Sequence, residues 1–416
     1  MLPALQVWIG PSYGIDFTDN YQMLGWNLSQ GNGYRFSTDT ALTMMREPGY
    51  PVFLAGLFSV FGYSLAAARM ANLAFTFVSA LLVSRLTLKL SGCELAARIA
   101  PAIFLLHPGM GLAEARGGLE CLFIMLLLIF FVLLYRALAS RRLVDYLFAG
   151  LVLGLSATVR STAMLFPVFL LAYFAIWERA RPSIVAMLSR VAVMIVAAFV
   201  MLTPWIVRNY RLVEQFVPTA SVAGVSAYAG YHICTNLTFS NTLYEVDDEA
   251  GVVRAQIARA AGIKFKETGN VYYLYFYDPH DELKFSRVLG ERVVQLYSQS
   301  PTLLPICAAK NFFHFWFSGK NWRVTAINFA IQVPYMILAG IGLVAGLRGK
   351  QSALFAPLLL FIVYTLCVYL PILAQARYSI HLLPFLSLLA AIPIARWWSR
   401  RAQSPDQSLT GSIANV

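Results

Sequence analysis

Charged residues are scarce in this sequence. Only 12% of its 416 residues are Asp, Glu, Lys or Arg, whereas 59% are hydrophobic, and the mean hydropathy is +0.64. A soluble domain carries about 25% charged residues, so this chain lacks about half of the charge that a water-facing surface would have. That shortage excludes an ordinary soluble domain and predicts a protein whose helices are solvated by lipid.

Cysteine is also sparse and has no metal-binding pattern. The five cysteines, Cys93, Cys121, Cys234, Cys307 and Cys367, form no CxxC pair, which argues against a zinc site. In the topology derived below only Cys234 and Cys307 share the outer compartment, and we do not expect a bridge between them. We name no cofactor: the sequence allows a divalent metal but does not support one.

The charge that is present is mostly positive, with a formal net charge of +12. Most of the cations stand at the ends of apolar runs. There they orient helices and meet anionic lipid headgroups, and they do not build a basic groove. We therefore expect membrane lipids as partners and no nucleic acid.

Apolar runs of spanning or near-spanning length recur along the chain. Because lipid-exposed backbone must satisfy its own hydrogen bonds, these runs predict helices and an all-α polytopic integral membrane protein. If the spans alternate, the clusters of arginine and lysine fall on one side, which is then cytoplasmic. The runs lie at about 66–88, 95–106, 119–138, 145–159, 161–177, 187–205, 326–346, 353–374 and 379–396.

Two long segments remain on the extracytoplasmic face. Residues 11–49 form the first outer loop, and residues 206–325 form what we call the outer region, with amphipathic helices. An enzyme acting at the membrane surface needs two such segments, whereas a channel or simple carrier rarely does. The predicted modules are 1–205, transmembrane and catalytic; 206–325, the outer region; 326–398, C-terminal transmembrane helices; and 399–416, a disordered cytoplasmic tail.

The first outer loop contains two aspartates, Asp16 and Asp19, ahead of a short amphipathic stretch. Tyr21, Leu24 and Leu28 fall on one face of a helix that glycines then end. The aspartates can cap this helix and hydrate the loop. Alternatively, one of them takes the proton of an acceptor hydroxyl as a general base.

The segment Arg46–Pro51 reads R-E-P-G-Y-P. Its two prolines fix a rigid turn where the chain re-enters the membrane. Such a turn holds Arg46 at headgroup depth, where a guanidinium can bind a phosphate bidentately, although an interfacial arginine would look the same. Glu47 either orients Arg46 through a local ion pair or binds the acceptor.

The ordered set of motifs resembles the GT-C glycosyltransferases. The most similar are the dolichyl-phosphate-mannose-protein mannosyltransferase-like and aminoarabinose-transferase-like enzymes of bacteria (glycosyltransferase family 39-type). The resemblance covers nearly the whole chain. Its landmarks are the loop aspartate, the Y-x5-N-L-x-x-G-x-G-Y pattern Tyr21–Tyr34, the turn Arg46–Pro51, Glu120 after the His107–Pro108 turn, Gly154–Arg160, Thr203–Tyr210 and Arg377–Phe385.

The resemblance implies a sugar donor on polyprenyl phosphate and a lipid, glycan or protein acceptor. It places the reaction at the periplasmic or exterior face of a bacterial inner membrane. Asp19, or else Asp16, would be the catalytic base. The resemblance and the needs of a phosphate leaving group together suggest Arg46, Arg160, Arg208 and Arg377 as donor-phosphate ligands, with Glu47, Tyr50 and Glu120 shaping the site.

Several alternatives stay open at this stage. Arg160 can be an arginine that merely ends its span, and Glu120 can pair with Arg116. The protein could instead be a lipid-linked glycan flippase or transporter, or a polysaccharide ligase or polymerase. One departure from the family keeps a non-catalytic role open: Met1–Gly10 is too short to span a bilayer, which takes about 20 residues, so the first helix is expected to be incomplete.

Overall fold

The computed structural model describes residues 20–116, 118–178, 182–237, 243–266, 274–319, 321–349 and 352–402. These residues are mainly helical, as the sequence predicts. The described strands are two short segments, β1 (Phe265–Lys266) and β2 (Tyr275–Phe276), which pair antiparallel. Asp16 and Asp19 lie outside the described residues.

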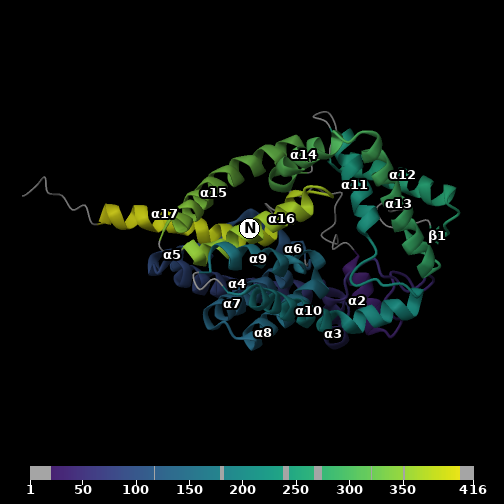
Figure 1. The fold of residues 1–416 in the computed structure, drawn as a ribbon. Coiled ribbons are helices and arrows are strands. Elements are labelled where there is room, and N and C mark those ends of the chain that lie inside the picture. Colours follow the sequence, from purple (N-terminus) through teal and green to yellow (C-terminus); the bar gives the residue numbers. More distant parts are fainter. Residues whose placement is uncertain are drawn as a thin grey trace, which may run out of the picture.

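The N-terminal half forms a bundle in which α8 packs against α7 and α10, and α4 packs against α5 and α7. The short helix α2 lies on α3 at one end of this bundle (Figure 1). The helices are α2 (Tyr21–Ser29), α3 (Gly49–Phe61), α4 (Leu65–Ser91), α5 (Glu94–Leu106), α6 (Pro108–Arg116), α7 (Glu120–Ser140), α8 (Leu143–Val159), η1 (Ser161–Ala163), α9 (Phe166–Ile176) and α10 (Ile184–Val213).

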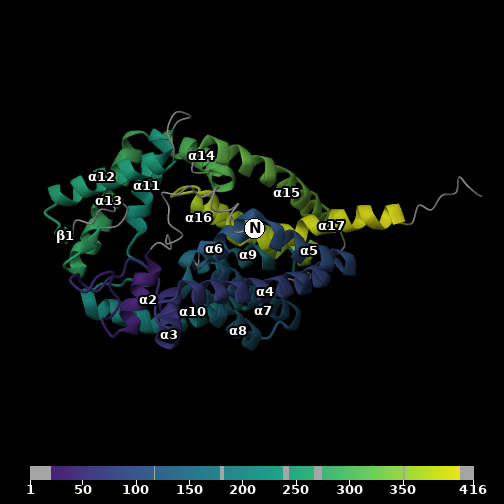
Figure 2. The same cartoon turned by 180° about the vertical axis from the view of Figure 1, so that it is seen from behind.

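The C-terminal half adds three long helices, and α17 packs between α15 and the N-terminal helices α4 and α5. The outer region supplies helices α11 to α14, which gather at the same end as α2, away from the C-terminal end of α17 (Figures 1 and 2). The helices are α11 (Ala223–Asn236), α12 (Leu243–Ala260), α13 (Pro279–Gln299), α14 (Leu303–Phe317), α15 (Trp322–Arg348), α16 (Ser352–Tyr369), η2 (Ala376–Leu382) and α17 (Leu383–Ala402).

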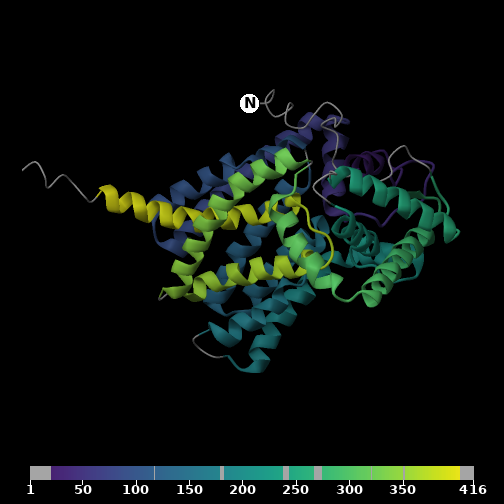
Figure 3. The ribbon, with the colours of Figure 1, turned by 90° about the horizontal axis from the view of Figure 1, so that it is seen from above.

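The expected spans are present as helices. Within the described residues, six helices are long and apolar enough to cross a membrane, and the number is seven if α5 and α6, which are bent by 55° at the break between them, are counted as one span. The bend falls at the predicted His107–Pro108 turn. Helices α8 and α9 are apolar but shorter than a full span. The protein is therefore an integral, multi-pass membrane protein, and Figure 3 shows its spanning helices beside the outer region.

Small residues allow α8 and α10 to pack with their backbones in close approach. A Cβ added at Gly150 would lie 2.5 Å from the carbonyl oxygen of Met194, and one added at Gly154 would lie 2.5 Å from that of Ala198. In lipid, where apolar side chains gain little by contacting each other, such close contact is a main source of helix association. This packing fixes the position of Arg160, which ends α8.

Ion pairs gather at the opposite end of α8. Arg136 contacts Asp145 at 2.9 Å, and Arg141 and Arg190 contact Glu178 at 3.2 and 2.7 Å. Arg136 and Arg141 belong to the clusters that the sequence assigns to the cytoplasmic side. Helix α8 thus runs from a paired, basic end to the end that carries Arg160.

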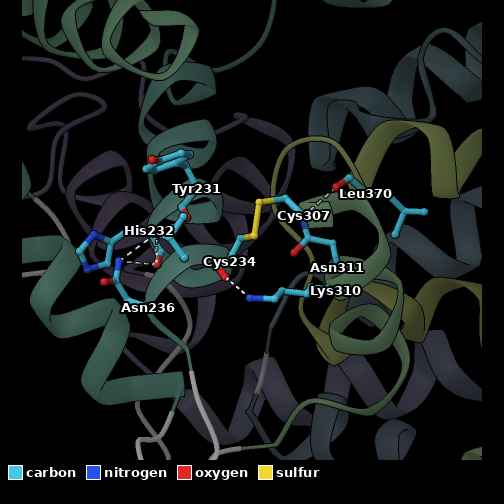
Figure 4. Close-up of a disulfide and its surroundings, with 9 residues drawn as sticks. Tyr231, His232, Cys234, Asn236, Cys307, Lys310, Asn311 and Leu370 are labelled. Carbon is cyan, nitrogen blue, oxygen red and sulfur yellow. Dashed lines mark hydrogen bonds between the residues drawn. A yellow bond between two sulfur atoms is a disulfide. The ribbon is translucent and has the colours of Figure 1, made fainter. Parts of the chain in front are cut away.

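The structure corrects one expectation. Cys234 of α11 and Cys307 of α14 form a disulfide across 73 residues of sequence (Figure 4). Beside it, Lys310 Nζ donates to the carbonyl oxygen of Cys234 at 2.9 Å, and Asn311 Nδ2 donates to that of Leu370 at 2.8 Å. The spacing of the two cysteines gives no sign of the bridge, because only the packing of α11 on α14 brings them together.

Candidate active site

The turn Arg46–Pro51 is held by one tyrosine of the first outer loop. Tyr34 donates its hydroxyl to the carbonyl oxygens of Arg46 and Glu47, each at 3.0 Å. Burial raises the pKa of Tyr34 well above its usual value, so the hydroxyl keeps its proton and remains a donor. Pro51 stands in the first turn of α3, where a missing N–H costs nothing. The predicted turn therefore occupies only the first half of the motif, Arg46–Pro48, and Gly49, Tyr50 and Pro51 already belong to α3.

Gly49 brings this turn against the end of α8. A Cβ added at Gly49 would lie 2.4 Å from Thr158 Oγ1 and 2.8 Å from the Thr158 carbonyl oxygen. Only glycine permits that approach. A second contact joins the same two stretches: Glu47 Oε1 accepts hydrogen bonds from Ser161 Oγ at 2.8 Å and from Ser161 N at 3.3 Å. The R-E-P-G-Y-P turn thus forms one local structure with the Gly154–Arg160 motif and with Ser161, which is 114 residues from Glu47 in sequence.

Arg160 and Arg377 meet at a single tyrosine ring. The guanidinium carbon of each lies 5.1 Å from the centroid of Tyr378, and Tyr378 stacks on Tyr369 at 5.0 Å. Nη1 of Arg160 is buried and donates to no acceptor in the described part of the chain. A buried guanidinium N–H without an acceptor is a donor available to an anionic ligand.

Arg208 approaches from α10. Its guanidinium lies over the rings of Trp205 and Tyr34, at 4.7 and 5.6 Å from their centroids. Nη1 donates to the carbonyl oxygen of Thr43 at 2.8 Å and to Asn209 Oδ1 at 2.9 Å, whereas Nη2 is buried and has no acceptor among the described residues. Arg208 therefore fixes the first outer loop with one nitrogen and leaves another available.

The four arginines lie along a series of tyrosines and polar contacts. Arg46 lies over the Tyr21 ring at 5.4 Å, and Glu47, the residue after Arg46, accepts a hydrogen bond from Ser161, the residue after Arg160. Tyr34 contacts both Arg208 and the backbone of Arg46. We call this arrangement the arginine–tyrosine row: Arg208, Tyr34, Arg46, Tyr21, Arg160, Tyr378 and Arg377. The structure thus brings the four predicted arginines together.

Two further predicted residues lie beside the row. Tyr50 is fully buried, with its ring 5.9 Å from that of Tyr21 in an edge-to-face contact. Glu120 begins α7, and its carboxylate acts electrostatically on both Arg160 and Tyr50. Its alternative partner, the side chain of Arg116, lies outside the described part of the structure. Both residues are thus placed where they can shape the site.

The proposed base falls on residues that the structure does not describe. The description starts at Asn20, the residue after Asp19, and Asn20 Nδ2 donates to the Tyr275 hydroxyl at 3.0 Å. Helix α2 follows as predicted, with Tyr21 and Leu24 buried. Its N-cap is Asn20 and not an aspartate, and the Asn20 side chain makes no capping bond. Asp16 and Asp19 lie outside the described residues, so both the capping and the catalytic interpretation of these aspartates stay predictions.

No metal site competes with the row in the described residues. No group of three or more His, Cys, Asp or Glu side chains there could hold a metal ion. A small cavity is lined in part by Tyr369, the ring on which Tyr378 stacks. No arginine lines it; its walls are Phe123, Thr162, Ala163, Phe361, Thr365, Tyr369 and His381.

Residues 46–208 match the family model described as dolichyl-phosphate-mannose-protein mannosyltransferase. The match covers less than half of the chain. It begins at Arg46, ends at Arg208 and contains Arg160, so three of the four arginines of the row lie within it. None of the curated proteins matches the chain in sequence.

Solved structures match almost the entire chain. The apo oligosaccharyltransferase of Archaeoglobus fulgidus is 13% identical, with a TM-score of 0.54 over 94% of this chain and 48% of its own. AglB of Archaeoglobus fulgidus, in complex with an inhibitory peptide and a dolichol-phosphate, gives 0.52 at 13% identity over 92% and 47%. This chain has the GT-C fold. It spans about half the length of these archaeal enzymes.

A GT-C enzyme closer in length also matches, although less well. ArnT from Cupriavidus metallidurans bound to undecaprenyl phosphate is 11% identical over 92% of this chain and 74% of its own. Its TM-score of 0.35 is too low to carry a structural argument. The resemblance to GT-C glycosyltransferases that the motifs predict is confirmed by the family model and by the fold.

Sequence reasoning about this GT-C chain missed one buried acidic residue, Glu282 of α13. A signal was present: Glu282 continues the stripe of Phe285, Leu289 and Val293, which are all buried. An acidic residue in an apolar stripe at helical spacing indicates a buried carboxyl group with specific partners.

Proposed function

We propose that this chain is a membrane glycosyltransferase that transfers a sugar from a polyprenyl-phosphate donor to a lipid, glycan or protein acceptor on the extracytoplasmic face. The observation that carries this proposal is the arginine–tyrosine row. It gathers four guanidinium groups at one end of a bundle with the GT-C fold. One relative with this fold was solved with a dolichol-phosphate, which supports the same class of donor here.

The row fits the electrostatic demand of the reaction. When the bond between the sugar's anomeric carbon and the phosphate oxygen breaks, its electron pair passes to the phosphate. Guanidinium groups already in place stabilise that charge without reorganising. Arg46 and Arg377 are half-buried, and the unpaired nitrogens of Arg160 and Arg208 are buried, so water screens the charge less than at a surface.

The new bond forms between the acceptor and the sugar. Its hydroxyl oxygen attacks the anomeric carbon, and its proton passes to a carboxylate, for which we propose Asp19 or else Asp16. Asp19 is joined through Asn20 to Tyr21, whose ring lies under Arg46. A single displacement of this kind inverts the anomeric configuration. The polyprenyl tail would add affinity from lipid-like contacts at about 0.8 kcal/mol per buried CH₂ group.

The disulfide supports an extracytoplasmic outer region. Disulfides persist in oxidising compartments such as the periplasm and the cell surface, and are rare in the cytosol. The bond between Cys234 and Cys307 lies among the outer helices α11 and α14. The paired arginines Arg136 and Arg141 lie at the other end of α8, as a cytoplasmic side requires. We therefore propose a bacterial inner membrane location with the row facing outward.

The donor site is tested by binding of undecaprenyl phosphate to the purified full chain in lipid nanodiscs, with undecaprenol as the phosphate-free control. Arg46→Ala should weaken binding of the phosphate and leave binding of undecaprenol unchanged. Arg46→Lys should recover only part of the affinity, because an ammonium cannot bind a phosphate bidentately. Equal affinity of wild type and Arg46→Ala for undecaprenyl phosphate would leave Arg46 as an interfacial anchor and refute the site.

The catalytic step needs a separate test. Mass spectrometry of envelope lipids and glycans from cells with and without the gene identifies a transferred sugar. In cells that carry Asp19→Asn the product should be lost while the protein still inserts and still binds undecaprenyl phosphate. Normal product from Asp19→Asn would remove this assignment, and Asp16→Asn then becomes the decisive variant.

A further inference from the structure

The side chain of Glu282 is buried where three segments of the chain meet. Only 3% of the residue is exposed. Its Oε2 accepts a hydrogen bond from Thr43 Oγ1 at 2.6 Å, and its Oε1 accepts from Met44 N at 2.9 Å and from the Ser221 hydroxyl. A single carboxyl group of α13 thus joins the first outer loop, 239 residues away in sequence, to the segment that precedes α11.

Thr43 and Met44 of the first outer loop also make hydrogen bonds to three other residues. The carbonyl oxygen of Thr43 accepts from Arg208 Nη1 at 2.8 Å, and Thr43 N donates to the carbonyl oxygen of Tyr34 at 2.9 Å. The carbonyl oxygen of Met44 accepts from Ser221 N at 2.9 Å. Arg46 follows two residues later. Its place in the row therefore depends on a backbone segment that Glu282 fixes.

Stability alone does not explain a carboxyl group at this position. Burying it is costly, and burial raises the pKa of Glu282, although its hydrogen bonds and the nearby charge of Arg208 act in the opposite direction. An apolar side chain would continue the buried stripe of Phe285 and Leu289 without that cost. What an apolar side chain could not do is accept three hydrogen bonds from Thr43, Met44 and Ser221.

We propose that Glu282 is a positioning residue of the donor site, because it attaches the turn that contains Arg46 to the outer region. Affinity for polyprenyl phosphate then depends on a residue of α13 that does not touch the ligand. This inference rests on the proposed function, because it takes Arg46 as a ligand of the phosphate. It also makes the outer region a working part of the donor site and not only its cover.

The test compares Glu282→Gln, Arg46→Ala and the double variant of the full chain in nanodiscs, with undecaprenyl phosphate as the probe. Glu282→Gln keeps the shape of the side chain but turns an NH₂ group toward a hydrogen-bond donor. We expect it to weaken binding by about tenfold. The double variant should bind no more weakly than Arg46→Ala alone, because Glu282 acts through Arg46. Glu291→Gln, on an exposed position of the same helix, is the matched control and should change nothing.

Each outcome decides between the two proposals. If Arg46→Ala weakens binding and Glu282→Gln does not, the inference is wrong and the proposed function stands. If the losses simply add in the double variant, Glu282 does not act through Arg46 and the inference is also wrong. If Arg46→Ala itself has no effect, the proposed phosphate site fails and the inference fails with it.

A second measurement guards against a variant that does not fold. Thr43→Val removes the hydroxyl that donates to Glu282 and leaves the carboxyl group in place. It should weaken undecaprenyl phosphate binding in the same direction and raise amide hydrogen exchange in residues 41–46. A purely structural role would instead lower the melting temperature with exchange raised throughout α13 and with unchanged affinity of the folded fraction. That result would overturn the inference.

Discussion

Replacing both cysteines of the disulfide by serine should destabilise the outer region by a predictable amount. The bridge closes a loop with a sequence separation of 73 between Cys234 and Cys307. Loop-closure entropy for that length corresponds to about 4 kcal/mol, an upper value because measured effects are commonly smaller. A loss of about 2–4 kcal/mol should lower the melting temperature of this region by about 5–10 °C. Cys367→Ser, at an exposed cysteine outside the disulfide, is the matched control.

The same change should reach the candidate site. Helix α14 supports the chain that leads to Arg377, because Asn311 Nδ2 donates to the Leu370 carbonyl oxygen and Ser318 Oγ accepts from Ala376 N at 3.1 Å. Loosening α14 should therefore weaken undecaprenyl phosphate binding as well as lower the melting temperature. The assay is thermal unfolding of purified protein with and without reductant, alongside nanodisc binding.

The outcome that refutes this reasoning is specific. Mass spectrometry first establishes that the wild-type bridge is formed. If reducing it then shifts the melting temperature no more than Cys367→Ser does, the loop-closure argument is wrong for this protein. If the bridge is absent from protein purified from intact cells under non-reducing conditions, the proposed extracytoplasmic orientation loses its main support.

Three further predictions follow from contacts in the site. Arg160→Ala should weaken undecaprenyl phosphate binding by about 10- to 100-fold, the value of one or two hydrogen bonds to a charged group, and unchanged affinity would show that Arg160 only ends α8. Tyr34→Phe removes two hydrogen bonds to the Arg46 turn and should cost about 1–3 kcal/mol of stability in thermal unfolding; no loss would mean that the turn is held without them. Gly49→Ala should lower the melting temperature, because the added Cβ would overlap Thr158. The control is Gly56→Ala in the same helix, where an added Cβ meets nothing within 4 Å, and equal effects of the two variants would contradict the close approach to Thr158.

The local features of this chain were predictable because each has a signal within a few residues. Apolar runs of near-spanning length predicted the long helices, and the spacing of Tyr21 and Leu24 predicted α2. The prolines of Arg46–Pro51 predicted a rigid turn, and His107–Pro108 predicted the bend between α5 and α6. In each case backbone sterics or helical periodicity acts locally, so a short stretch of sequence is sufficient.

The features that were missed depend on tertiary approach. The disulfide requires α11 to pack on α14, and the partners of Glu282 come from segments far away in sequence. The apolar stripe of α13 marks Glu282 as a buried carboxyl group, but it does not state which segments supply its partners. The double use of Arg208, which binds the Thr43 carbonyl as well as lying in the row, is also invisible in the motif that contains it. The sequence therefore predicted that these arginines lie near one another, but it did not predict the contacts that hold them.

The alternation of arginine and tyrosine explains how the row can exist before a ligand binds. Four guanidinium groups placed side by side would repel one another strongly in a weakly screened site. Each guanidinium carbon instead lies 5.1–5.6 Å from the centroid of a tyrosine ring, which offers it the negative face of a π-system. The carboxyl groups of Glu47, Glu120 and Glu282 lie close enough to act on these residues. They do not outnumber the four cations in the described part of the site, so a surplus of positive charge remains for a phosphate. A site built in this way should favour the phosphate most strongly when its negative charge is largest, as the sugar leaves.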